Sequence, residues 1–476
     1  MKILLVKPLG HDPLNNAVTH PLGLMYLAAY LRRRRPGRDT IRLLDMRLYA
    51  RKRALEELSA LLSGFRPDIV GISGLTTEHK NIFRVANLAK ELHKGSLVIA
   101  GGPHSTSYPQ QTMECRDIDY AVQQEGEETF FELIETLEKG LDPAGIPGLS
   151  LRKGDAVRVN QSRGFIEDVD SLPFPAWDLI EVGKYSTRKR QSPLRIGPYM
   201  SIYTSRGCPF GCVYCHNIFG KAFRARSVDN ILAEMQELID RYSLDEFDIV
   251  DDIFNFDRER ASHFFEEIIK RRMKVRILFP NGLRADLLDE EVIALMKEAG
   301  VVMAAIAIES ASPRIQKLMN KNINLDKTEG MIKALAKQGI ATSGFFMLGF
   351  PTEKKEELKL TLDFALRSHL AMGVFFMVIP FAGTQLGEGI KNKSAGLAPV
   401  RQFDYFSSTF NLSGVGRFYL FWFHKIAWLR FYLGRRRMGY FLKHINAKNF
   451  ILAMNLFLKW IEALWAGTYR LIRCNP

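Results

Sequence analysis

The feature that most constrains the fold of this 476-residue chain is an alternation of short apolar runs with amphipathic stretches. In the N-terminal region, amphipathic stretches such as 22–31 and 82–92 separate runs of three or four mainly apolar residues. Strands that alternate with helices are typical of a parallel sheet covered on both faces. The sequence therefore predicts an α/β domain with a doubly wound parallel sheet. The candidate strands are 3–6, 41–44, 69–72, 97–100 and 120–122.

The same alternation returns between about residue 200 and residue 381. Six strand–helix units suit an open (β/α)6 partial barrel, and the chemistry of such barrels lies at the carboxyl ends of the strands. The candidate strands are 201–204, 247–250, 275–279, 304–308, 342–347 and 374–379, and the candidate helices are 228–242, 258–272, 289–299, 325–338 and 354–368.

Two stretches differ in composition from these regions. Residues 145–198 are rich in proline and glycine, which is typical of a domain boundary. From Arg417 to the end, 11 lysines and arginines stand against one acid, and four of the five tryptophans lie there. We expect a mostly helical segment, including a helix at 450–467, that either lies in a membrane interface or packs on the barrel with its arginines solvated. The expected domains are 1–145, 146–198, 199–385 and 386–476.

Three cysteines, Cys208, Cys212 and Cys215, are spaced four and then three residues apart. Three thiolates can ligate three irons of one 4Fe–4S cluster and leave the fourth iron open to a small molecule. A structural zinc site needs four ligands, and the nearest fourth candidate, His216, directly follows Cys215. A disulfide would leave one thiol unpaired. The spacing therefore predicts an iron–sulfur cluster.

This spacing, with the aromatic Tyr214 before the last cysteine, resembles the signature of the radical S-adenosylmethionine (SAM) superfamily. The basic segment 221–226 is similar to one that many members carry. The resemblance implies that SAM chelates the open iron, and that its reductive cleavage yields a 5′-deoxyadenosyl radical.

The resemblance also implies a SAM site at the strand ends. Acidic or polar groups would lie near the methionyl amine, the ribose and the carboxylate, and the glycine-containing segment 344–351 would line the adenine. Arg284 either contacts the carboxylate or pairs with Asp286. The predicted SAM residues are Asp251, Asp252, Arg284, Glu309, Ser310, Gly344, Leu348 and Gly349.

The N-terminal region resembles the cobalamin-binding domain that precedes many radical SAM domains, through segments 21–30, 101–104 and 126–130. Arg47 stands where some cobalamin domains have a cobalt-ligating histidine, so the cobalt would lack a protein imidazole beneath it. A scaffolding sheet without the cofactor is the alternative. The predicted cobalamin residues are Asp45, Arg47, Ser73, Gly74, Leu75, Thr76, Gly101, Gly102, Pro103, His104, Glu125, Gly126 and Glu127.

Together these resemblances imply a cobalamin-dependent radical SAM enzyme that functionalises an unactivated carbon, most often by methylation. Relatives with this domain pair also form rings, rearrange or oxidise, and the sequence does not choose among these reactions. A methylthiotransferase would carry a second cysteine trio in its first domain, where only Cys115 is present. A membrane-associated cobalamin or redox sensor is the alternative from another class, but it would not need Glu309 or the segment 344–351.

The expected partners are a small-molecule substrate and a reducing electron donor of the flavodoxin or ferredoxin type. An apolar lipid, isoprenoid or natural-product substrate would explain the aromatic, cationic C-terminal segment, and so would peripheral contact with the inner membrane face. Nucleic acid is disfavoured, because no RNA-binding module accompanies the net charge of +14. The first residues read as a buried strand rather than a signal peptide, and no run of 18 uncharged apolar residues is present. Five cysteines, three of them clustered, fit a reducing compartment, so a cytoplasmic protein is expected.

Overall fold

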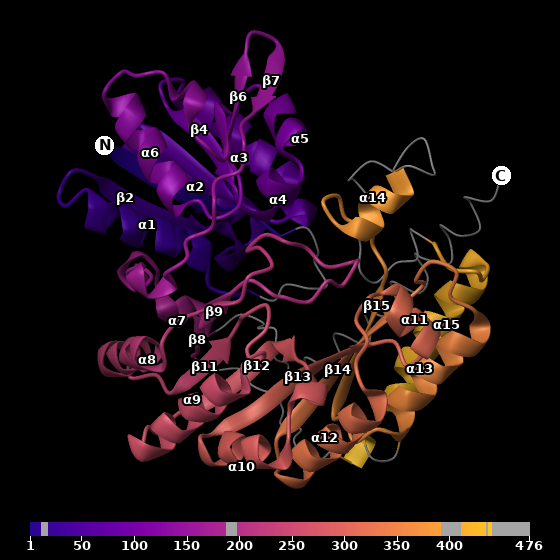
Figure 1. Ribbon diagram of the computed structural model, residues 1–476. Coiled ribbons are helices and arrows are strands. Elements are labelled where there is room, and N and C mark those ends of the chain that lie inside the picture. The colour runs from indigo at the N-terminus through magenta and orange to yellow at the C-terminus, as the bar shows by residue number, and fades with distance from the viewer. Residues whose placement is uncertain (11–17, 187–197, 392–410, 435–436, 440–476) are drawn as a thin grey trace. The chain divides into compact units, whose positions relative to one another are not determined.

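The computed structural model describes residues 1–10, 18–186, 198–391, 411–434 and 437–439 (Figure 1). The chain separates into two units. Among the described residues, the first unit comprises 1–10, 18–186, 198–210, 215–252 and 381–391, and the second comprises 211–214, 253–380, 411–434 and 437–439. The predicted barrel region 199–385 is thus shared between them.

The first unit contains a seven-stranded sheet in the order β2-β1-β3-β4-β5-β6-β7. The first five strands of the chain are parallel, and all five were predicted. They are β1 (Lys2–Lys7), β2 (Thr40–Asp45), β3 (Ile69–Ser73), β4 (Leu97–Gly101) and β5 (Tyr120–Val122). The strand order reverses between β1 and β3, and ligands of such sheets bind beyond the carboxyl ends at this switch point.

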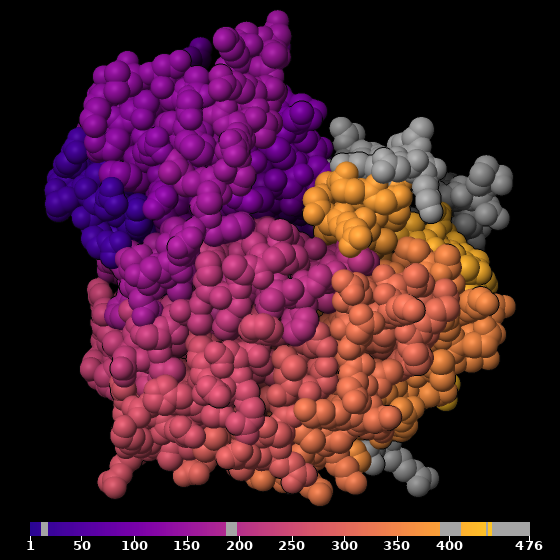
Figure 2. All heavy atoms as spheres, in the orientation of Figure 1, coloured from indigo at the N-terminus to yellow at the C-terminus, as the bar shows by residue number. Residues whose placement is uncertain are grey.

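An antiparallel hairpin, β6 (Leu149–Lys153) and β7 (Ala156–Val159), continues the sheet beyond β5. Figure 2 shows it projecting from the rest of the first unit. It falls in the proline- and glycine-rich stretch 145–198 that the sequence marked as a domain boundary.

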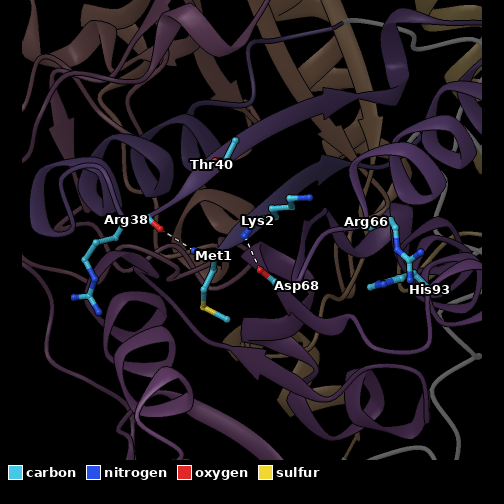
Figure 3. A pocket seen from close by; sticks show the side chains of 7 residues that line it. All are labelled: Met1, Lys2, Arg38, Thr40, Arg66, Asp68 and His93. Carbon is cyan, nitrogen blue, oxygen red and sulfur yellow. Dashed lines mark hydrogen bonds between the residues drawn. The ribbon is translucent and has the colours of Figure 1, made fainter.

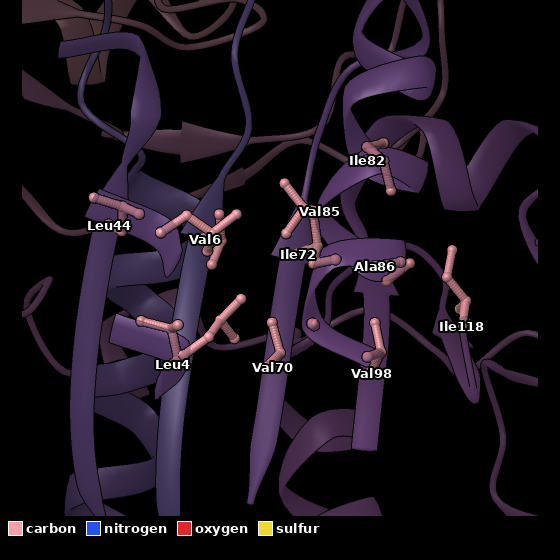
Figure 4. Close-up of a cluster of buried hydrophobic side chains, with 14 of the residues drawn as sticks. Leu4, Val6, Leu44, Val70, Ile72, Ile82, Val85, Ala86, Val98 and Ile118 are labelled. Carbon is pink, nitrogen blue, oxygen red and sulfur yellow. The ribbon is translucent and has the colours of Figure 1, made fainter. Parts of the chain in front are cut away.

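Helices cover both faces of this sheet because successive side chains of a strand point to opposite sides. Leu4 and Val6 of β1 pack in one hydrophobic cluster with α2 (Arg51–Phe65) and α3 (His79–Leu92), as Figure 4 shows in part. Ile3 and Leu5 pack in another cluster with α1 (Leu22–Arg34) and α6 (Glu127–Glu138). This confirms the predicted doubly wound sheet. Two short helices, α4 (Gly102–Ser107) and α5 (Pro109–Glu114), follow β4.

The rest of the first unit begins the predicted barrel. Strand β8 (Met200–Ile202) pairs in parallel with β11 (Glu246–Ile249), and β9 (Ser205–Arg206) pairs antiparallel with β10 (Arg224–Ala225). Helix α8 (Val228–Tyr242) starts where the Ser227 hydroxyl accepts a hydrogen bond from the Asn230 N–H. Helices α7 (Val182–Tyr185) and α14 (Gln385–Lys391) complete this unit.

The second unit contains four parallel strands in sequence order: β12 (Arg276–Leu283), β13 (Val301–Glu309), β14 (Ala341–Leu348) and β15 (Met372–Met377). With β8 and β11 they make the six strands that were expected along the chain. The helices of this unit are α9 (Arg258–Lys270), α10 (Glu290–Glu298), α11 (Pro313–Leu318), α12 (Leu325–Lys337), α13 (Lys355–Arg367) and α15 (Arg417–Tyr432).

Helix α15 packs on β15, so the described start of the basic C-terminal segment is part of the second unit. The Phe431 ring lies where a side chain on Gly373 would stand, 3.0 Å from the Cβ position. One prediction for this segment was that its arginines are solvated, but Arg437 is buried. Its guanidinium donates to carbonyls at the end of α13, among them those of Ala365 and Leu366, each at 2.7 Å. A cation at a helix C-terminus stabilises the helix. The predicted helix at 450–467 lies outside the described residues.

Candidate cofactor-binding sites

The loop that carries the three cysteines runs between β9 and β10. Gly207 has a φ of +84°, and a Cβ there would overlap the Ala222 carbonyl oxygen, so only glycine fits. The Cys208 N–H donates to the Gly220 carbonyl at 3.3 Å, and this bond joins the two ends of the loop. Cys208 and Cys212 are half-buried, and Cys215 is exposed. Cys208 and Cys215 belong to the first unit and Cys212 to the second.

Within the described ranges, no group of three His, Cys, Asp or Glu side chains is arranged around a single metal ion. The three thiolates of a 4Fe–4S cluster each bind a different iron, so they do not need to meet at one point. The donor set of three cysteines in one loop fits such a cluster.

Asp251, two residues beyond the end of β11, holds the backbone just before this loop. It is 2% exposed, and its carboxylate accepts bonds from the Thr204 N–H at 2.6 Å, the Ser205 hydroxyl at 2.7 Å and the Thr204 hydroxyl. These contacts assign Asp251 to positioning the start of the loop.

Asp252, the next residue, has a different environment. Its Oδ1 lies 3.9 Å from Nε2 of His216, which directly follows Cys215. Burial raises the pKa of the Asp252 carboxyl, and His216 and Lys221 act in the opposite direction. The Asp251 carboxylate is occupied by three hydrogen-bond donors of the protein, whereas the Asp252 carboxylate lies beside the cysteine loop without such donors. Asp252 is therefore the better placed of the two to contact a ligand.

In the second unit, Glu309 ends β13 with a φ of +67°, which is strained for a residue other than glycine. Its carboxylate lies 3.3 Å from Nζ of Lys321, which is also 3.4 Å from the Tyr214 hydroxyl. Through these two contacts, Lys321 connects Glu309 at the end of β13 with Tyr214, the residue before Cys215. Ser310 is fully buried, and its hydroxyl contacts Thr361 at 3.2 Å, so it stabilises the turn from within.

The turn after β14 contains Gly349, whose φ is +89°. The Glu353 Oε2 accepts the N–H groups of Gly349 at 2.7 Å and Phe350 at 3.1 Å. Glu353 is fully buried and its Oε1 has no partner among the described residues. Burial raises the pKa of Glu353 to about 7. Sequence reasoning missed this residue, although a carboxyl group two residues beyond a Gly-Phe-Pro turn is a local signal.

The other predicted SAM residues of this unit are held by the protein itself. Leu348 is fully buried, and a Cβ on Gly344 would lie 2.5 Å from the Leu370 side chain, so both face the packed interior. Arg284 forms a two-pronged pair with Asp286, at 3.1 Å and 2.7 Å, which is the structural alternative that the sequence had left open.

At the carboxyl edge of the first sheet, charged side chains pair with one another. Lys7, which sequence reasoning missed, pairs with Glu78, and burial lowers the pKa of this lysine. The Arg47 guanidinium pairs with Asp45 at 2.6 Å and donates to the Thr19 carbonyl at 2.6 Å. Asp45 also accepts a bond from the Tyr185 hydroxyl at 3.0 Å. The edge is polar and ordered, as expected where an open sheet binds a ligand.

The glycine turns after β3 and β4 lie against each other at the same edge. Gly102 has a φ of +80°, and a Cβ there would lie 2.5 Å from the Ser73 hydroxyl oxygen and 3.3 Å from the Gly74 nitrogen. Leu75 is 48% exposed, whereas Thr76 is buried. The turns thus bring the predicted cobalamin residues of both strands together.

His104, two residues after Gly102, is fully buried, and neither ring nitrogen has a hydrogen-bond partner among the described residues. Its ring lies 5.4 Å from that of Tyr108 and 5.6 Å from that of His79. Burial, with a smaller effect of His79, lowers the pKa of His104 to about 3, so the imidazole is neutral near pH 7. A buried neutral imidazole with unused nitrogens fits a site that is completed by a ligand.

Glu125 and Glu127 face in another direction. Their carboxylates pair with Arg206 and Arg224, which flank the cysteine loop. Neither arginine was singled out from the sequence, although Arg206 stands two residues before Cys208.

A hollow of about 470 Å³ opens at the opposite, amino-terminal edge of the first sheet (Figure 3). Its lining comprises Met1, Lys2, Arg38, Thr40, Arg66, Asp68 and His93. None of the predicted site residues lies there, so this hollow is not the candidate site.

Comparisons with known proteins agree with this arrangement. Residues 16–134 match the B12 binding domain family, and residues 202–365 match the radical SAM superfamily. An uncharacterized methyltransferase of Pyrococcus horikoshii is 34% identical over 394 residues, which cover 82% of this chain and 83% of that protein. The cytidylyl-2-hydroxyethylphosphonate methyltransferase of Streptomyces wedmorensis is 28% identical and aligns over 81% of this chain and 80% of its own length.

Among solved structures, the radical SAM methyltransferase TsrM of Kitasatospora setae, with cobalamin and a 4Fe–4S cluster bound, superposes with a TM-score of 0.66. The match covers 84% of this chain and 76% of that chain at 21% identity, which shows a shared fold. The predicted fold class, a doubly wound sheet followed by a partial barrel, is therefore confirmed.

These findings define an enzyme that pairs a cobalamin-binding domain with a radical SAM barrel. The chain belongs to the family of cobalamin-dependent radical SAM methyltransferases. The expected cofactors, a 4Fe–4S cluster, SAM and cobalamin, are confirmed at the level of this family.

Proposed function

We propose that this chain methylates an unactivated carbon of a small molecule. The observation that carries the proposal is the cysteine loop at 208–215, which lies within a radical SAM domain that follows a B12-binding domain in the same chain. Together the bound cofactors would supply a carbon radical and a transferable methyl group. The protein supplies position and exclusion of water, because such a radical attacks almost any C–H bond.

Cys208, Cys212 and Cys215 are the proposed cluster ligands. The bond from the Cys208 N–H to Gly220 and the three bonds that Asp251 accepts would keep the loop in one conformation. The proposed SAM contacts are Asp252, beside the loop, and Glu309 and the Gly349 turn in the second unit. Lys321 would set the charge and direction of the Glu309 carboxylate.

The proposed cobalamin contacts are the backbone of the two glycine turns, the side chains of Leu75 and His104, and the Asp45–Arg47 pair. Support comes from the close approach that only glycine allows at Gly102 and from the unused nitrogens of the buried His104. Arg47, in place of a ligating histidine, would present a cation that Asp45 already neutralises.

For the substrate we propose an apolar molecule, a lipid, an isoprenoid or another natural product. This is supported by the row of apolar side chains that are more than 40% exposed on α15 and at the residue after it: Phe418, Ile426, Leu429 and Leu433. The same row would support peripheral contact with the inner membrane face. In the part of the chain that the structure describes, no helix is long and apolar enough to cross a membrane. The proposed electron donor is a flavodoxin or ferredoxin.

Anaerobic reconstitution tests the proposal. The protein is loaded with iron, sulfide and hydroxocobalamin, reduced with dithionite, and supplied with SAM. We expect cobalamin absorbance to stay with the protein after gel filtration and 5′-deoxyadenosine to form. With methyl-deuterated SAM, a substrate pool from the host should gain one CD3 group, whereas a ring-forming or oxidative enzyme would transfer no deuterium. A protein that takes up neither cofactor and leaves SAM intact would contradict the proposal.

A further inference from the structure

The cysteine loop is bounded by two arginines that face each other. Arg206 ends β9, two residues before Cys208, and Arg224 begins β10, nine residues after Cys215. The two residues are direct partners in the antiparallel β9–β10 ladder. Whatever holds these two side chains therefore holds both ends of the loop.

Two glutamates bind these arginines: Glu125 in the turn after β5 and Glu127 at the start of α6. Arg206 donates to Oε1 of Glu125 at 3.0 Å and to Oε1 of Glu127 at 2.7 Å. Arg224 donates to the other oxygen of Glu125, Oε2, at 3.0 Å. Glu125 thus uses one oxygen for each arginine, and its Oε2 also accepts the Ile166 N–H at 2.8 Å.

All four side chains are withdrawn from water, with exposed fractions between 3% and 8%. Two carboxylates balance two guanidinium groups, so the cluster is neutral as a whole. Removing one partner from such a buried set leaves an uncompensated charge, which is strongly unfavourable. The set therefore imposes one geometry on the residues that carry it.

The arginines pass this constraint to the loop itself. Arg224 donates to the carbonyl of Phe219, within the loop, at 2.7 Å, and the Arg206 guanidinium lies 5.5 Å from the Phe219 ring centroid. Arg206 also lies over the Tyr26 ring of α1, at 5.2 Å. Each arginine contacts the N-terminal sheet region on one side and the cysteine loop on the other.

We propose that Glu125, assisted by Glu127, is a positioning residue for the 4Fe–4S loop and not a cobalamin contact. This inference rests on the proposed function, in which Cys208, Cys212 and Cys215 hold the cluster. The turn at 125–127, which the sequence had linked to cobalamin, directs both carboxylates to the arginines. The first domain thus contributes to the stability of the cluster.

The variants Glu125→Gln and Glu127→Gln test this inference, with Asp39→Asn as the matched control. Asp39 is another acid with a 2% exposed side chain paired with an arginine, Arg35, but it lies at the amino end of β2. The measurements are the rate at which an iron chelator removes iron from the reconstituted protein, the Kd for hydroxocobalamin, and the melting temperature of the apoprotein.

We expect Glu125→Gln to lose iron about tenfold faster than wild type, because partners beyond the ligands commonly change metal retention by one to two orders of magnitude. Glu127→Gln should have a smaller effect, since only Oε1 of Glu127 bonds an arginine and a glutamine oxygen can replace it. The Kd for cobalamin should stay within about twofold of wild type in both variants.

Three outcomes would overturn the inference. Weaker cobalamin binding with an unchanged rate of iron loss would make Glu125 a cobalamin contact. Equal iron loss from Asp39→Asn and Glu125→Gln at equal melting temperatures would make the effect a general loss of stability. A wild-type protein that takes up no cluster would overturn the proposed function as well, whereas a stable wild-type cluster that Glu125→Gln retains equally overturns this inference alone.

Discussion

The segment 204–207 in the first unit and the turn at 349–350 in the second are each held by one buried carboxylate, yet the two carboxylates differ. Asp251 accepts three hydrogen bonds through both oxygens from Thr204 and Ser205. Glu353 accepts two N–H groups through one oxygen, and its second oxygen has no partner among the described residues. Burial of a carboxyl group that keeps an unbonded oxygen disfavours the charged form, which raises the pKa of Glu353. The entry to the cysteine loop is therefore held firmly, and the Gly349 turn is held in a way that depends on pH.

The largest effect is expected from Asp251→Ala. One buried N–H and two hydroxyls would lose their acceptor, and the free energy of unfolding of the apoprotein should fall by about 4 kcal/mol. Urea unfolding measures this change.

Asp252→Ala is the control. The Asp252 carboxylate lies 3.9 Å from Nε2 of His216, so its removal should lower the free energy of unfolding by less than about 1 kcal/mol. Equal losses in the two variants would show that Asp251 does not hold the loop entry in the way described.

The next effect concerns the pH dependence of stability. The folded pKa of Glu353, about 7, lies above the ordinary value of 4.5. The folded state therefore binds the proton more tightly, and the stabilisation from this group is present below pH 4.5 and is lost as the pH rises through 7. The loss should total about 3 kcal/mol.

Glu353→Gln imitates the protonated form and should remove this component from the pH profile. The difference between wild type and variant in urea unfolding at pH 5 and pH 8 measures it. If the stability of wild type and of Glu353→Gln changed equally between pH 5 and pH 8, Glu353 would not have a raised pKa in the folded state.

The smallest effect is the difference in unfolding free energy between alanine variants of the glycines in the two segments. Gly207→Ala should cost about 3 kcal/mol, because its Cβ would meet the Ala222 backbone as well as adopt a positive φ. Gly349→Ala should cost about 1.5 kcal/mol, since its Cβ would meet the Leu420 side chain at 3.0 Å, and that side chain can move. Thermal unfolding of both variants shows which substitution is the more destabilising. A larger loss of stability in Gly349→Ala would mean that the backbone at Gly207 adapts to a side chain more easily than the backbone at Gly349.

Local patterns sufficed for most of the fold. The apolar runs predicted five parallel strands of the first sheet and all six barrel strands. Strands buried on both faces consist of short apolar runs, which can be recognised in the sequence alone. The rule that sites lie at carboxyl ends led to the positions of Asp251, Glu309 and His104 before their surroundings were known.

Pairings between distant residues could not be predicted in this way. Glu125 and Arg206 are 81 residues apart, and charge pairing over such a separation has no local pattern. For the same reason the sequence could not show that Arg437 caps α13. The pairing of Arg284 with Asp286, two residues away, was one of the two roles that the sequence left open. Sequence periodicity indicates which face of an element is buried, but not which charged groups meet there.

The proposed function depends most on Cys208, Cys212 and Cys215, which we propose hold a 4Fe–4S cluster whose open iron binds SAM. Electron paramagnetic resonance of the dithionite-reduced, reconstituted protein tests it most directly, with spectra recorded before and after SAM is added. We predict a reduced-cluster signal in the wild type that changes on addition of SAM, and no such signal in the variant with all three cysteines replaced by alanine. A wild-type signal that SAM leaves unchanged, or a cluster signal that persists in the triple variant, would contradict the claim.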